Sequence, residues 1–128
     1  MRARHALFFA LVLPAATGCE KTTKDRLEGR WLGESVDNAP AAQAAQIAGW
    51  AKGTAIEFAG SKATITIPAE SPRTGSYQIT RDDGQSLLLA FSRAEGGKDE
   101  AAFRFVGEDQ LRWSLPEGPE LVLVRAKN

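Results

Sequence analysis

The side chains best suited to nucleophilic and metal chemistry are almost absent from this sequence. Its single histidine is His5 and its single cysteine is Cys19, so the stretch from Glu20 to Asn128 contains neither residue. Catalytic triads and zinc or copper sites are built largely on imidazole and thiolate groups. Carboxylates, lysines and hydroxyls remain. We expect a protein that is not an enzyme, with no metal site and no cofactor.

Two short segments carry groups that could bind ions or phosphate. Asp82 and Asp83 precede Gly84 and could offer oxygen ligands to calcium. Their spacing lacks the regularity of an EF-hand, and an acidic pair before glycine is typical of a hairpin turn. The EGGKD stretch, residues 95–99, has neither the spacing of a Walker loop nor a following helical pattern. Both segments are therefore predicted to be turns.

The first 18 residues have the layout of a secretory signal peptide. Arg2 and Arg4 form a short positive segment, and Ala6–Leu13 form an apolar run too short to span a bilayer. The sequence ATGC at 16–19 resembles the lipobox of bacterial lipoproteins, which implies cleavage before Cys19 and lipid attachment to it. The alternative is an ordinary cleaved signal that leaves a free cysteine. A lone thiol exported to an oxidising compartment would be a liability, which favours lipidation.

Lipidation of Cys19 would anchor the protein to a membrane, because several acyl chains at one residue hold stably where one does not. Residues 19–27 are polar and charged and are interpreted as a tether, so the folded domain is expected over 28–128.

Without Arg2 and Arg4, 14 basic and 16 acidic residues remain. No basic run stands out, which argues against a nucleic-acid partner. Glu20 stands where lipoproteins retained in the inner membrane carry aspartate. We therefore expect an exported protein on the outer membrane, with its domain in the periplasm or at the cell surface.

Most of the remaining sequence alternates apolar and polar residues with a period of two, interrupted by turn-forming residues. Seven such runs lie between Ala55 and Arg125, and an eighth surrounds Trp31. An alanine-rich stretch over about 40–52 instead has helical spacing, with Asn38 as its expected N-cap and Gly53 as its stop. Eight short strands predict an antiparallel sandwich or barrel. The interior of an eight-stranded barrel is either filled by side chains or holds one small ligand.

The LEGRW stretch, Leu27–Trp31, resembles the first strand of the lipocalin and fatty-acid-binding superfamily. There a Gly-x-Trp closes one end of an up-and-down barrel, and an Arg or Lys from the last strand packs across the indole. The matching residues are Gly29, Trp31 and Arg125. The second lipocalin motif is absent, and the predicted helix lies between strands one and two. The resemblance implies a small, eight-stranded, lipocalin-like antiparallel barrel.

If Trp31 points inward, strand parity predicts an interior that is almost entirely apolar. The inward residues include candidates for a ligand pocket, with the helix as a lid: Trp50, Phe58, Ile65, Tyr77, Phe91, Phe103, Phe105 and Trp113. The first hypothesis is a barrel that binds a small hydrophobic or amphipathic molecule. The alternative is a solid barrel that docks to another envelope protein, with Trp50 on the helix as the anchor.

Overall fold

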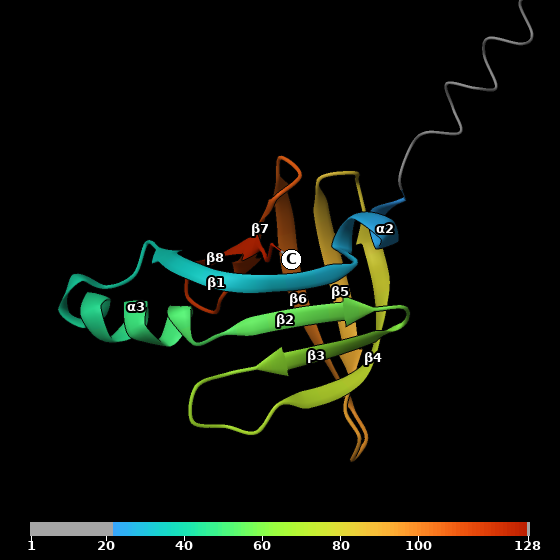
Figure 1. The fold of residues 1–128 in the computed structure, drawn as a ribbon, viewed down its shortest axis with the longest axis horizontal. Helices are drawn as coiled ribbons and strands as arrows, with labels where there is room; N and C mark the ends of the chain where they lie inside the picture. Colours follow the sequence, from blue (N-terminus) through green and yellow to red (C-terminus); the bar gives the residue numbers. More distant parts are fainter. Residues whose placement is uncertain (1–21, 128) are drawn as a thin grey trace, which may run out of the picture.

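Eight antiparallel strands close into an up-and-down barrel in the computed structural model, which describes residues 22–127 (Figure 1). Each strand pairs with the next along the chain, and the last pairs with the first. The fold class and strand number are therefore as predicted. The predicted signal peptide, Cys19 and Glu20 lie outside the described residues. The strands are β1 Gly29–Asp37, β2 Ala55–Ala59, β3 Lys62–Thr66, β4 Arg73–Asp82, β5 Ser86–Ser92, β6 Lys98–Val106, β7 Gln110–Ser114 and β8 Glu120–Arg125.

The pairing register places one apolar face of every strand inside the barrel. Trp31 lies opposite Ile56 on β2 and Arg125 on β8. Side chains of residues paired in this way point to the same face of the sheet, so the inward direction of Trp31 fixes which residues of the next strands point inward. The residues that alternation predicts to point inward are buried in one cluster or packed against it, except Ile67, which follows β3 at the barrel end. The fully buried members with the largest side chains are Trp31, Phe58, Phe103, Phe105, Leu27, Ile56, Leu89, Leu111, Leu121 and Leu123.

Two bulges adjust this parity. One falls on β1 between Gly33 and Ser35, opposite β8, and the other on β4 between Ile79 and Arg81, opposite β5. A bulge adds one residue to one strand and so exchanges the faces of the residues beyond it. Val36 consequently packs against the core, although strict alternation from Trp31 would point it outward.

A short helix, α2 (Thr23–Leu27), covers the end of the barrel from which β1 starts (Figure 1). Thr22 caps it through a capping box with Asp25, which satisfies two of the free backbone donors of its first turn. Leu27 is fully buried in the core. We expected residues 19–27 to form a tether. The part of that segment seen in the structure, from Thr22 onward, instead belongs to the barrel domain.

The helix predicted over 40–52 is present as a 3-10 turn, η1 (Ala41–Gln43), followed by α3 (Ala44–Lys52). Gly53 is its C-cap, as predicted. Asn38 is not the N-cap: it has a φ of 62° and lies in the connection before Pro40. The helix packs on β1, and this contact needs the absence of a side chain at Gly33, because a Cβ there would collide with the carbonyl of Ala51.

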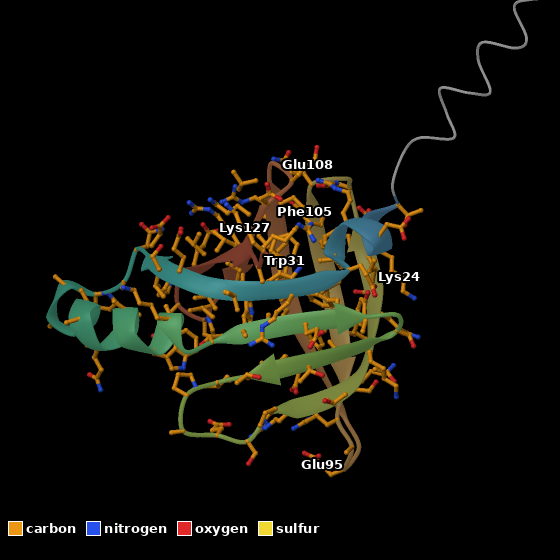
Figure 2. All side chains as sticks on the ribbon, in the orientation of Figure 1. Lys24, Trp31, Glu95, Phe105, Glu108 and Lys127 are labelled. Atoms are coloured by element: carbon orange, nitrogen blue, oxygen red, sulfur yellow. The ribbon has the colours of Figure 1, made fainter. Side chains whose placement is uncertain are left out.

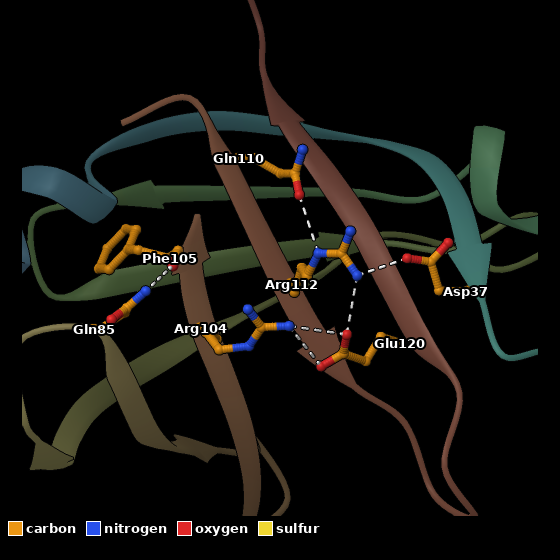
Figure 3. Close-up of polar contacts among 7 residues, drawn as sticks. All are labelled: Asp37, Gln85, Arg104, Phe105, Gln110, Arg112 and Glu120. Atoms are coloured by element: carbon orange, nitrogen blue, oxygen red, sulfur yellow. Dashed lines mark hydrogen bonds and ion pairs between the residues drawn. The ribbon is translucent and has the colours of Figure 1, made fainter. Parts of the chain in front are cut away.

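On the outside of the barrel, an ionic network crosses four strands (Figure 3). Arg112 on β7 donates to Asp37 and, at 3.1 Å, to Glu120 on β8. Glu120 also accepts from Arg104 on β6 at 3.1 Å. The hydrogen bonds from Arg112 to Asp37 and then Glu120 raise the pKa of the guanidinium above its ordinary value. The network holds β1 and β8 against β6 and β7 where the barrel closes.

Candidate functional site

One end of the barrel is closed and the other is open. Helix α2 covers the closed end. The closed end also carries the turns at 60–61, 83–85 and 107–109. Trp31 fills it, and its Nε1 donates to the carbonyl of Leu27 at 2.8 Å. The Arg125 guanidinium lies 4.2 Å from the centroid of the Trp31 ring. The predicted plug and its cation–π partner are therefore in contact.

Arg125 does more than cover the indole. Its guanidinium donates to the carbonyls of Glu28, Arg26 and Glu108 at 3.0, 2.7 and 3.1 Å. These bonds satisfy backbone acceptors of α2 and of the β6–β7 turn. The neighbour of Gly29 is the Arg125 side chain, and the φ of 118° at this position favours glycine. Gly29, Trp31 and Arg125 together therefore close this end of the barrel.

The opposite end carries a cavity of about 940 Å³. We call this end the mouth; it carries the loops 67–72, 93–97 and 115–119 and the connection 38–54, which contains α3. Apolar side chains from four strands and from the loops of this end line the cavity. They include Ala63, Ile65, Ile67, Phe91, Ala101, Trp113 and Leu115. A volume of this size is within the range of small-molecule sites.

A layer of aromatic rings lies between the cavity and the closed end. Phe58 and Tyr77 pack edge to face at 5.0 Å, and Tyr77 lies 6.4 Å from Phe91. Phe103 follows, 6.2 Å from Phe91 and stacked on Trp113 at 5.5 Å. Phe91 and Trp113 line the cavity, whereas Phe58, Tyr77 and Phe103 are buried behind them. The barrel is therefore filled in its closed half and hollow at its mouth.

Three of the eight predicted pocket residues line the cavity: Ile65, Phe91 and Trp113. Phe58, Tyr77, Phe103 and Phe105 are core residues. Trp50 on α3 is half-buried against the core and does not line the cavity. Alternation with Phe103 and Phe105 could have placed Ala101 inside the barrel, but its sequence position does not show that its small side chain leaves space. The charged rim residues follow no pattern that predicts a site.

The rim of the cavity carries charges of both signs. Arg73 pairs with Glu70 at 3.3 Å, and Arg93 pairs with Asp99 at 3.4 Å. Glu95 and Glu100 also line the cavity. The arginine and carboxylate side chains of both pairs are about half exposed or more, so their positions are held only weakly. A molecule with an apolar body and a polar or charged head group would match an apolar wall below and a charged rim above.

The Tyr77 hydroxyl is buried and has no hydrogen-bond partner among residues 22–127. Burial, and to a smaller extent the nearby negative charge of Glu28, raise the pKa of Tyr77 above its ordinary value. The hydroxyl therefore stays protonated at neutral pH and does not supply a base.

The acidic pair at Asp82–Asp83 forms the predicted hairpin turn. Asp83 accepts from the backbone N–H groups of Gln85 and Ser86 at 3.0 and 2.7 Å, and these bonds lower the pKa of Asp83 below its ordinary value. Asp82 accepts from the N–H of Gly84 at 2.8 Å. Within residues 22–127, no group of three histidine, cysteine or acidic residues is arranged to hold a metal ion. Over the same residues, no helix has the length and apolar character needed to cross a bilayer.

Comparison of the chain with protein-family models, curated proteins and solved structures found no match.

Proposed function

We propose that this protein is a lipid-anchored envelope lipoprotein that binds a small hydrophobic or amphipathic molecule at the mouth of a lipocalin-like barrel, without catalysing a reaction. The observation that carries the proposal is the cavity of about 940 Å³ with its wall of aliphatic and aromatic side chains. Releasing water from such a wall favours apolar ligands by roughly 25 cal/mol per Å² of surface buried. The charged rim would keep a polar head group in contact with water.

Titration with a fluorescent fatty acid or a hydrophobic dye tests the proposal. We expect saturable binding by the wild-type barrel and a strong loss of affinity in Ala101→Trp, because an indole at this position would occupy the cavity. The matched control is Ala59→Trp, since Ala59 lies at the closed end of β2 with its side chain exposed. Equal affinity in both variants, or no binding by the wild type, would contradict the proposal.

Trp113 offers an independent readout, since it lines the cavity whereas Trp31 is fully buried. Ligand uptake should change the intrinsic tryptophan emission, and this change should be lost in Trp113→Phe. A change that persists in Trp113→Phe would place the ligand elsewhere.

A second candidate function is docking to another envelope protein through α3. Most of this helix is exposed, and Trp50 remains only half-buried beside small residues, as in an interface anchor. Photocrosslinking from position 50 in cells tests this function. Capture of a defined partner at 50, but not from the exposed outer-face position Gln78, would support it.

A further inference from the structure

The chain enters the barrel domain at a fixed point of the closed end. The Thr23 hydroxyl donates to Asp82 at 2.6 Å, and Arg26 donates to the carbonyl of Gly84 at 2.8 Å. Arg26 also lies over the Phe105 ring at 4.0 Å, and Leu27 is fully buried in the core. Arg125 holds the carbonyl side of the same helix. Helix α2 is therefore part of the barrel end and fixes the position of Thr22.

Only three residue steps separate Thr22 from Cys19. An extended chain spans at most about 3.6 Å per residue, so these steps reach roughly 11 Å. The ten residues of β4 run from the mouth to the closed end, which at about 3.3 Å per residue is of the order of 30 Å. A lipid attached at Cys19 can therefore reach the closed end easily, and the mouth lies well beyond the length of this linker.

We propose that the closed end faces the anchoring bilayer and that the cavity opens away from it, toward the aqueous phase. This orientation rests on the proposed lipidation of Cys19. It assigns the bilayer as the partner of the closed end, and it deepens the proposed function: the ligand is an amphiphile that arrives through water, as a monomer or on a carrier, and is not extracted directly from the membrane that holds the protein.

The surface of the closed end fits a position among lipid head groups. Lys24, Glu108 and Lys127 are exposed there, and Figure 2 shows Glu95 of the mouth at the opposite edge of the molecule from Glu108. Among residues 22–127, the exposed large hydrophobic side chains are Leu32 and Val106, which project from different strands. Such a surface can lie against a polar interface without inserting into the hydrocarbon core.

Short-range quenching measures the orientation directly. The full-length lipidated protein is reconstituted into phosphatidylethanolamine and phosphatidylglycerol vesicles that contain a lipid with a nitroxide on its head group. A fluorophore is placed on single introduced cysteines at exposed positions, which is feasible because the native Cys19 is consumed by lipid. The closed-end positions are Lys24→Cys and Glu108→Cys, and the mouth positions are Ser71→Cys and Glu95→Cys.

We expect a large loss of fluorescence at 24 and 108 and little loss at 71 and 95. The matched control is the same labelled variants starting at Glu20, which lack the anchor and should show no quenching. Equal quenching at all four positions, as for a barrel lying on its side, or stronger quenching at 71 and 95, would overturn the orientation. A mature protein without acyl chains by mass spectrometry would overturn it too. The readout needs no ligand, so a failure of dye binding is distinguished from a failure of orientation.

Discussion

At the scale of single residues, the interactions at the closed end are concentrated on Arg125. One guanidinium contacts an indole face, three backbone carbonyls and, at 3.4 Å, the carboxylate of Asp109. Its planar fork of five donors allows this, whereas the ammonium of lysine has a single point of charge. The residue therefore links α2, the β6–β7 turn and β8.

Replacing Arg125 by methionine should lower the free energy of unfolding by about 2–4 kcal/mol. The lost cation–π contact accounts for roughly 1 kcal/mol, and the carbonyls left without a donor account for most of the rest. Arg125→Lys should fall between methionine and wild type. Urea denaturation measures the difference, and Arg30→Met, at an exposed outer position, should change stability by less than about 0.5 kcal/mol. Equal effects at 30 and 125 would contradict this account of the closed end.

Tyr77→Phe should leave stability unchanged or raise it by up to about 1 kcal/mol, because it removes a buried hydroxyl that has no partner while keeping the ring contacts. Thermal or chemical unfolding measures the change. A loss of more than about 1 kcal/mol would show that the hydroxyl has a bound partner, such as ordered water.

The hairpin turn at Asp83 should make stability depend on acid pH. Its folded-state pKa is lowered by bonds from Ser86 and Gln85, so the unfolded chain binds the proton more readily. The contribution is present above the unfolded pKa, near 3.9, and is lost as the pH falls below about 4 through the folded pKa. Urea midpoints from pH 6 to pH 2.5 should therefore fall more steeply for wild type than for Asp83→Asn. Parallel curves would refute the role of this carboxylate.

At the scale of elements, the short N-terminal helix α2 is the least expected part of the fold. Five residues are too few to be stable alone, so the helix depends on its cap and on burial of Leu27. The charged composition of this segment resembles a linker, and only the spacing of the Thr22–Asp25 capping box indicates a helix start. The contact of Leu27 with the core could not be seen from sequence because it depends on where the barrel end lies.

Leu27→Ala should lower the free energy of unfolding by about 2–4 kcal/mol, as expected for a fully buried leucine replaced by alanine. Leu32→Ala makes the same chemical change at an outward position that is 37% exposed, and should cost less than half as much. Guanidinium unfolding compares the two. If Leu27→Ala behaved like Leu32→Ala, α2 would be an independent tether and its fixed position at the closed end would be wrong.

At the scale of the whole molecule, the barrel could be predicted from alternation and turn spacing. Each strand has one solvent-exposed face and one buried face, so polar and apolar residues alternate along it with a period of two. The inward positions of Phe58, Phe103 and Leu123 could also be predicted, but not that Phe58 and Phe103 fill the core instead of lining a pocket. The cavity could not, since it depends on how far the rings reach and on small residues such as Ala101. The rim charges lie on loops or at the ends of β4 and β6, where the alternating pattern does not show which side chains come together.

Closure of the barrel also has a consequence for the order in which the protein is made. Arg125 and Glu28 are joined by a hydrogen bond although they are 97 residues apart in the chain, and β1 has no second neighbour until β8 exists. Contacts of such long range form slowly, and a ribosome presents β8 after every other strand. The barrel should therefore stay open, with one edge of β1 unpaired, throughout synthesis, a state that the proposed export through a translocation channel would require.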